Sequence, residues 1–409
     1  MISRKMTALA AGSSVIRAMF EEGNRLAALY GRENVYDFSL GNPNFPSPEP
    51  VKTAIIDVVT NTDPVELHGY MSNIGYPAVR RAIAGSLNAS HGTKFDEGNI
   101  IMSCGAAGAL NVVLKTLLNP GDEVIVFPPY FVEYGNYINN YDGRLVAVPA
   151  LADSFLPDID ALESALTPAT KAVIINSPNN PTGVIYPEDV IRRLAGALER
   201  NAQEFGTPIY IISDEPYREL AYDGAAVPWL TGFYNNTIVC YSWSKSLSLP
   251  GERIGYIVIP SELDEYELIY GAAGIATRVL GFVNAPSLMQ RVVAMCLSEK
   301  ADINAYDINR MLLYNALKSY GYTPVFPQGA FYLWLKAPCV TSGPPGLDAD
   351  KAFAEEAKKH NILLVPGSSF GCPGYLRIAY CVAKTVIEKS LPGFQKLAVQ
   401  YGLSADNEA

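Results

Sequence analysis

Lys245 is placed where a lysine can act as a nucleophile. It follows the apolar run 237–240, which has the composition of a buried strand, so we expect its side chain at a strand end and partly buried. Burial disfavours the ammonium form and lowers the pKa, as a lysine that forms Schiff bases requires. Taken alone, Ser-x-Ser-Lys would be no more than a polar surface loop.

The residues around Lys245 are suited to binding a phosphate group. Ser242 and Ser244 offer hydroxyls, and Arg253 follows beside glycines. A second phosphate-binding candidate follows another predicted strand and opens a helix, where small residues let backbone N–H groups approach an anion: Gly105, Ala106 and Ala107. The cofactor that uses a lysine, phosphate ligands and a buried acid together is pyridoxal phosphate.

Asp214 is the candidate for that acid, because it directly follows the apolar run 208–213. A carboxylate there would keep the pyridine nitrogen protonated. The alternative is a helix N-cap, since Asp214-Glu215-Pro216 could also open a helix. Tyr217, three residues further on, could donate to the cofactor's phenolic oxygen and adjust the pKa of the Schiff base.

Three further residues are candidates for cofactor or substrate contacts. Asn180, in Asn-Asn-Pro-Thr-Gly, follows an apolar run and could bind a phenolate and a carboxylate, although the motif also fits an ordinary turn. Tyr130 offers a ring to stack on the cofactor, or is an exposed turn residue. Arg377 lies within an apolar strand and needs a partner there, either a local acid or the substrate α-carboxylate.

Composition restricts the class of protein. The chain has 409 residues, 49% hydrophobic and 18% charged, which is typical of a globular enzyme with two domains. A net charge of −10 argues against nucleic acid and anionic membranes as partners, and the apolar runs are too short for a bilayer span. Three scattered histidines predict no metal site. Six cysteines without a CxxC pair are typical of a reduced, cytoplasmic protein.

From about residue 100 the chain alternates short apolar runs with turns and helical stretches. The runs lie at 99–103, 123–127, 171–176, 208–213, 237–242 and 255–260. This order predicts an α/β fold with a doubly wound, mainly parallel sheet, whose ligands bind at the carboxyl ends of the strands. We expect a large domain over 45–285. A smaller α+β domain would combine 1–44 with 286–409.

With these motifs in order, the chain resembles the aspartate aminotransferase superfamily, the class I/II aminotransferases of the pyridoxal-phosphate-dependent fold type I. The resemblance runs almost end to end, from 37–43 through His68-Gly69-Tyr70 to the motifs of Asn180, Lys245, Arg253 and Arg377. It implies a homodimer that moves amino groups between an amino acid and a 2-oxo acid in a ping-pong mechanism.

The resemblance also implies a role for each motif residue. Lys245 would form the Schiff base and move the proton, with Asp214 on the pyridinium. The phenolic oxygen would be bound by Asn180 and Tyr217, and the ring would stack on Tyr130. The phosphate would be held by the Gly105 loop (Ala106 and Ala107 backbone), Ser242, Ser244, Arg253 and Tyr70 of the neighbouring subunit. The substrate carboxylate would bind Arg377 and the Gly41 backbone.

One departure concerns the substrate. Some bacterial relatives carry a lysine for a distal carboxylate where this chain has Ala106 and Ala107. Arg278 of the partner subunit could replace it, which makes aspartate and glutamate candidate donors.

Parts of the sequence also agree with activities other than aminotransfer. The same site motifs also serve β-lyases acting on cysteine S-conjugates and amino-acid decarboxylases. Gly-Ser-Ser-Phe-Gly at 367–371 imitates a hydrolase motif, but no histidine follows Ser369, so a hydrolase is excluded. A degenerate regulatory module does not agree with an intact lysine, aspartate and asparagine.

Overall fold

The computed structural model describes residues 2–11, 15–338 and 348–404. Its centre is a seven-stranded sheet in the order β2–β8–β7–β6–β5–β3–β4. Neighbouring strands are parallel except β8, which runs antiparallel to both β2 and β7. The strands are β2 (Ile100–Ser103), β3 (Glu123–Val126), β4 (Arg144–Ala147), β5 (Thr170–Asn176), β6 (Tyr210–Asp214), β7 (Thr237–Ser242) and β8 (Gly255–Val258).

The six predicted apolar runs correspond to six of these strands, and only β4 was missed. β4 lies at the edge of the sheet, and all four of its residues are at least partly exposed. An edge strand buries little side-chain surface, so it carries no apolar run for sequence reasoning to detect.

Helices cover both faces of the sheet because its strands alternate their apolar side chains between two sides. Ile125, Val173 and Ile211 pack with α8 (Ile159–Ala165) and α9 (Glu188–Phe205), while Val124 and Ile174 pack with α6 and α11 on the other side. The other helices of this part are α3 (Glu49–Asn61), α4 (Pro64–His68), α5 (Pro77–His91), α6 (Gly105–Leu117), α7 (Glu133–Asn140), α10 (Trp243–Ser246), α11 (Tyr266–Val279) and α12 (Ser287–Met295).

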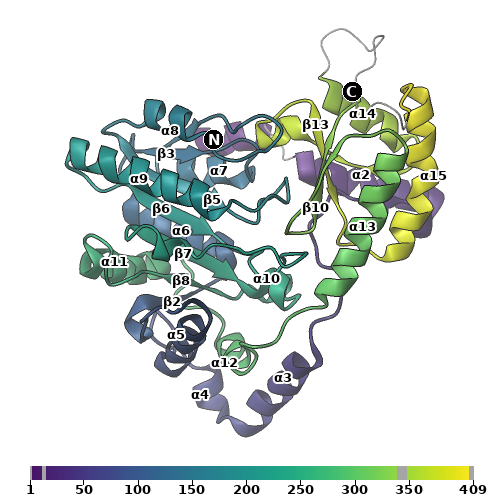
Figure 1. Cartoon of the computed structure of the whole chain (residues 1–409). Helices are drawn as coiled ribbons and strands as arrows, with labels where there is room; N and C mark the ends of the chain where they lie inside the picture. Colours follow the sequence, from purple (N-terminus) through teal and green to yellow (C-terminus); the bar gives the residue numbers. More distant parts are fainter. Residues whose placement is uncertain (1, 12–14, 339–347, 405–409) are drawn as a thin grey trace.

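A smaller part on the right of Figure 1 combines an N-terminal segment with the C-terminal part of the chain, whereas the N-terminus itself lies on the left, against the large part. Its sheets are β1–β11 and β12–β13–β10–β9. The strands are β1 (Tyr36–Asp37), β9 (Pro324–Val325), β10 (Tyr332–Lys336), β11 (Ile362–Leu363), β12 (Val365–Pro366) and β13 (Tyr375–Ala379). Its helices are α2 (Val15–Tyr30), α13 (Ile303–Ser319), α14 (Ala349–Lys358) and α15 (Lys384–Gln400). The first helix, α1 (Arg4–Ala11), lies beside α7 of the large part, where Lys5 Nζ donates to the Asn139 carbonyl at 2.8 Å. The predicted fold class, a mainly parallel α/β sheet with an α+β part, is confirmed.

The division into domains remains a proposal, with one adjustment. Buried residues of α12, Met289 and Val293 among them, share a core with α3 and α5 of the large part. We therefore propose that the large domain continues beyond residue 285 to about Cys296. The Gly- and Pro-containing stretch at 281–286 resembles a linker in sequence, although the chain returns to the same core after it.

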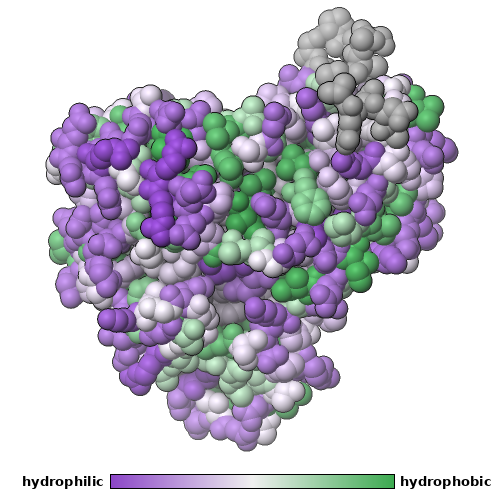
Figure 2. All heavy atoms as spheres, in the orientation of Figure 1, coloured by the Kyte–Doolittle hydropathy of each residue, from purple (hydrophilic) through white to green (hydrophobic). Residues whose placement is uncertain are grey.

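Hydrophilic side chains cover most of the face in Figure 2, and hydrophobic ones show along the furrow between the two parts. Within the described ranges, no helix combines the length and the apolar character needed to cross a bilayer.

Candidate active site

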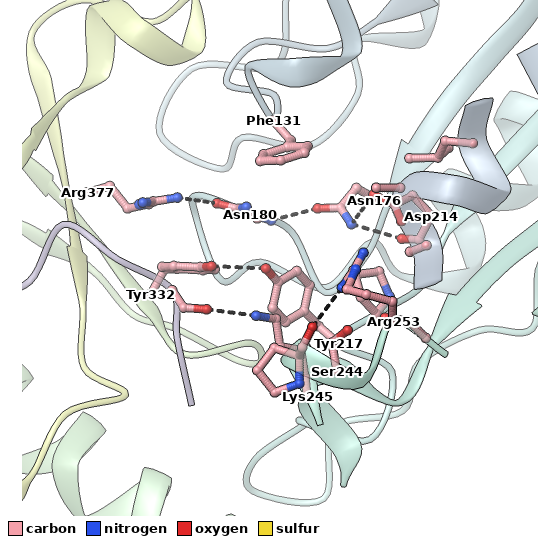
Figure 3. Close-up of a pocket in the computed structure, with 17 residues that line it drawn as sticks. Phe131, Asn176, Asn180, Asp214, Tyr217, Ser244, Lys245, Arg253, Tyr332 and Arg377 are labelled. Atoms are coloured by element: carbon pink, nitrogen blue, oxygen red, sulfur yellow. Dashed lines mark hydrogen bonds between the residues drawn. The ribbon is translucent and has the colours of Figure 1, made fainter. Parts of the chain in front are cut away.

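A cavity of about 280 Å³ lies at the carboxyl ends of β5, β6 and β7 and faces β10 and β13 of the smaller part (Figure 3). This is the edge at which parallel sheets bind their ligands. Its lining includes most of the predicted site residues: Gly41, Ala106, Ala107, Asn180, Asp214, Tyr217, Ser242, Ser244, Lys245, Arg253 and Arg377.

Lys245 lies in the short helix α10, three residues after β7. Its Nζ donates to the Gly41 carbonyl at 2.7 Å and lies 5.2 Å from the centre of the Phe331 ring. Burial lowers the pKa of this amine to about 8. At neutral pH a much larger fraction of the amine is therefore in the nucleophilic neutral form than for a lysine in water.

Asp214 is the last residue of β6 and is almost fully buried. Its Oδ2 accepts a hydrogen bond from the Tyr134 hydroxyl at 2.6 Å, whereas its Oδ1 has no partner among the described residues. Burial raises the pKa of this carboxyl to about 7, although the Tyr134 hydrogen bond acts in the opposite direction. The turn that follows Asp214 is not a helix, so the N-cap alternative is not realised.

The first turn of α6 and Arg253 converge on one end of the cavity. Gly105 begins α6 with φ 73°, and a Cβ there would lie 2.7 Å from Arg253 Nη2. Glycine is therefore required for the guanidinium to lie against the helix N-terminus. Free N–H groups, the helix dipole and a guanidinium together form an anion site, with Ser242 and Ser244 beside it.

Arg377 and Asp214 are joined by a row of hydrogen bonds along the cavity (Figure 3). Arg377 Nη1 donates to Asn180 Oδ1 at 3.1 Å, the Asn180 backbone N–H donates to Asn176 Oδ1 at 2.7 Å, and Asn176 Nδ2 donates to the Asp214 carbonyl at 2.8 Å. Arg377 Nη2 also donates to the Ser39 carbonyl at 2.6 Å. The row holds the side-chain oxygen of Asn180 against Arg377 and ties its backbone, through Asn176, to the end of β6.

Two tyrosines complete the wall opposite Phe131. The hydroxyls of Tyr217 and Tyr332 lie 2.9 Å apart, and the Tyr332 ring lies 4.6 Å from the Arg377 guanidinium. A Cβ on Gly41 would lie 1.9 Å from the Tyr332 hydroxyl oxygen. Only glycine at position 41 therefore lets the chain pass between Tyr332 and Lys245.

Tyr130 does not lie where ring stacking was predicted. Its ring packs beside Gly371 and Pro128, outside the cavity, and the next residue, Phe131, lines the cavity instead (Figure 3). The aromatic pair was recognisable in the sequence, but the turn decides which of two adjacent rings points inward.

Sequence reasoning also missed Tyr134, Asn176 and Tyr332. Asn176 is the last residue of a correctly predicted strand, and the period of that strand was a usable signal. The partnership between Tyr134 and Asp214 joins distant segments, and no local pattern reveals it.

Two predicted residues lie away from the cavity of their own chain. Tyr70 is 92% exposed, and Arg278 is exposed in the last turn of α11. Their segments are adjacent, because Asn73 Nδ2 donates to the Val283 carbonyl at 2.6 Å.

A lysine with a lowered pKa, an unpartnered buried carboxylate oxygen and a helix end suited to an anion lie together in one cavity, as in the active site of an enzyme. The family model for aminotransferase class I and II matches residues 33–391, and the chain belongs to that family. It is accordingly a transferase of amino groups, and the lysine Schiff base and two half-reactions are general to the family.

Solved structures and curated relatives agree with this assignment. A crystal structure of an amino transferase from Eubacterium rectale is 46% identical and covers 98% of this chain and 99% of its own, with a TM-score of 0.93. The aspartate aminotransferase of Thermus thermophilus with maleate is 27% identical, covering 97% and 99%, with a TM-score of 0.84. A probable aspartate/prephenate aminotransferase of Thermus aquaticus is 32% identical over 87% of this chain and 89% of its own.

Proposed function

We propose that this aminotransferase uses pyridoxal phosphate held by Lys245 and acts as a homodimer on amino acids and 2-oxo acids, with aspartate or glutamate as donor. The observation that carries the cofactor is Asp214 Oδ1, a buried carboxylate oxygen without a partner among the described residues. A protonated pyridine nitrogen would supply the missing donor, and its positive charge would favour the carboxylate form. The anion site at α6 and Arg253 fits the phosphate.

When bound, pyridoxal phosphate supplies an aldehyde for the amino group and a ring that withdraws electrons from the substrate Cα. The protein then has to move one proton. Lys245 Nζ is the group for this, because its pKa near 8 lets it accept and return a proton near neutral pH. Tyr217 would donate to the phenolic oxygen, and Phe131 would cover the ring in the role first given to Tyr130.

Arg377 would bind the substrate α-carboxylate. It is 2% exposed, its two hydrogen-bonded partners are neutral oxygens, and its Nε has no partner in the described part of the chain. A carboxylate would supply the missing negative charge in the bidentate geometry that guanidinium prefers. The Gly41 backbone lies beside this position.

The homodimer proposal rests on the exposed surface around Tyr70 and α11. Val65, Tyr70, Ile275 and Val279 are large apolar residues, each more than half exposed. On α11 the last two lie four residues apart, on one face. A second copy seated there would bury them and bring Tyr70 and Arg278 to the neighbouring cavity, where Tyr70 would reach the phosphate and Arg278 a distal carboxylate.

A dicarboxylic donor agrees with the printed names of several relatives, which are aspartate or aspartate/prephenate aminotransferases. Neither Ala106 nor Ala107 can bind a distal carboxylate through its side chain, so Arg278 is the residue on which this part of the proposal depends. We also propose a cytoplasmic location, which the unpaired thiols of the five described cysteines support. Cys339 lies outside the described residues.

The test is an absorbance titration of the protein loaded with pyridoxal phosphate, using a panel of amino acids and assaying the products. Loss of the absorbance band of the loaded lysine, restored by a 2-oxo acid, is the expected result, with aspartate or glutamate the most effective donor. Release of ammonia and pyruvate would identify a β-lyase, and release of carbon dioxide a decarboxylase. A protein with no such band after loading would contradict the cofactor proposal.

A further inference from the structure

A second cavity, of about 230 Å³, lies behind the segment that carries Lys245, between α5 and α10. Ser242, Ser244 and Lys245 face the first cavity, whereas Tyr241, Trp243 and Ser246 line the second. Side chains alternate sides at the end of β7 and then point around the turn of α10, so one short segment forms the wall between the first cavity and this second chamber.

The inner wall of this chamber is aromatic. The rings of Tyr241 and Tyr256 are stacked at 4.7 Å, and the Trp243 ring stands 5.4 Å from Tyr241 and 5.3 Å from Tyr256. The faces of such rings carry negative electrostatic potential and attract cations, above all organic ammonium ions.

The same chamber holds a carboxylate with an unpartnered oxygen. Glu219 Oε1 accepts from the Tyr241 hydroxyl at 2.9 Å, while Oε2 is buried and has no hydrogen-bond partner among the described residues. Leaving a buried polar atom without a partner is unfavourable, so a ligand that donates to Oε2 would remove that penalty.

Burial raises the pKa of the Glu219 carboxyl, so a bound cation would favour its charged form, and no positive group of the described residues forms an ion pair with it. Arg218 is bound to Glu215 and to the carbonyls of Val227 and Pro228. His91 stacks on Trp229 at 4.3 Å, and burial lowers its pKa to about 4, so it is uncharged at neutral pH. Lys300 is exposed at the rim, where Glu299 stands beside it.

We propose that this chamber is a binding site for a small organic ammonium ion, whose N–H donates to Glu219 Oε2 and whose alkyl groups lie against Tyr241, Trp243 and Tyr256. The volume is below that of a drug-sized pocket, which restricts the ligand to a small amine. The site is separate from the aminotransferase cavity, and its occupancy does not depend on the proposed function.

The experiment uses trimethylammonium as the probe, because it has one N–H donor and cannot form a Schiff base in the other cavity. Binding to the full-length, cofactor-loaded protein is measured by calorimetry and ligand-observed NMR. We expect millimolar affinity, at least tenfold stronger than for tert-butanol, a neutral molecule of similar shape. Tetramethylammonium, which lacks the N–H, should bind more weakly than trimethylammonium.

The variants distinguish binding inside the chamber from attraction of the cation to the acidic protein surface. Glu219→Gln should weaken trimethylammonium binding at least tenfold, whereas Glu299→Gln at the rim should change it less than twofold. Ser86→Leu fills the mouth from α5 and should also abolish binding, which provides a second test if Glu219→Gln does not fold. Equal binding of tert-butanol, no binding of the ammonium ion, or binding that survives both Glu219→Gln and Ser86→Leu would overturn the proposal.

Discussion

Arg310 and Arg377 are both almost fully buried, at 1% and 2% exposed, but their surroundings differ. Arg310 pairs with Asp307 and Asp223, donates to the Pro327 carbonyl, and packs on Tyr222 and Phe326. Arg377 also packs on aromatic rings, but its hydrogen-bonded partners are neutral oxygens, and its Nε has no partner in the described structure.

This difference in partners distinguishes an arginine that stabilises the fold, Arg310, from one that is available to bind a ligand, Arg377. A buried arginine with carboxylate partners is satisfied by the fold, whereas one with neutral partners is ready to bind a carboxylate from outside. Asp214 and Lys245 belong with Arg377 in this respect. The groups around the first cavity are those that the fold has left without a charged partner, which is what a site awaiting ligands requires.

The largest expected effect concerns the lysine. Lys245→Ala should lower the turnover of the loaded enzyme by about a thousandfold or more, because no other described lysine lines the cavity. Single-turnover loss of the cofactor absorbance after mixing with amino acid measures it. A variant that keeps the wild-type rate would remove Lys245 from the mechanism.

Arg377→Leu should lower kcat/KM for amino acids by about a hundredfold, since a guanidinium–carboxylate pair in a buried site is worth about 2–5 kcal/mol. Its stability should change little or increase, because the arginine lacks a charged partner. Steady-state kinetics and urea unfolding of the same sample give both numbers. A large loss of stability would instead show that Arg377 stabilises the fold, as Arg310 does.

Arg310→Leu is the matched change and should have the opposite outcome. Loss of its two ion pairs and the bond to Pro327 should cost about 2–4 kcal/mol of unfolding free energy. The kcat of the folded enzyme should stay within twofold. If kcat fell as far as it does in Arg377→Leu, the contrast between the two arginines would not hold.

Asp214 should make the unloaded protein sensitive to pH. Its pKa is near 7 when folded and near 4 when unfolded, so the stability it contributes is present at low pH and is lost as pH rises through 7. Asp214→Asn does not titrate, and its stability relative to wild type should rise by about 2–4 kcal/mol between pH 5 and pH 8. Urea unfolding at both pH values tests this, and a constant difference would contradict the assigned pKa.

The smallest effect is expected for Arg278→Ala. The preference for aspartate over alanine should fall about tenfold, the value of one partly exposed charged hydrogen bond, while alanine turnover stays unchanged. The ratio of kcat/KM for the two donors measures it. An unchanged preference would show that Arg278 does not recognise the substrate. The dimer proposal would then depend on Tyr70 alone.

Sequence alone predicted the features that local patterns encode. Short continuous apolar runs located β2, β3 and β5–β8, and the residues that follow those strands led to Asp214, Asn180 and Lys245. What it missed depends on tertiary contacts, such as the bond from Tyr134 to Asp214 and the choice of Phe131 over Tyr130. β4 was missed for another reason, since an edge strand needs few apolar residues.

The pairing of β1 with β11 affects the order in which the chain folds during its synthesis on the ribosome. Tyr36 is made long before its partner Ile362. The Ser39 carbonyl likewise has to remain without its donor until Arg377 has been made. Because synthesis is slow compared with local folding, the large sheet can form while the segment that holds Gly41 is still unpaired. The catalytic pocket is therefore completed only after β11 and β13 have been made, and a chain truncated before β11 should have its sheet but no site for a substrate carboxylate.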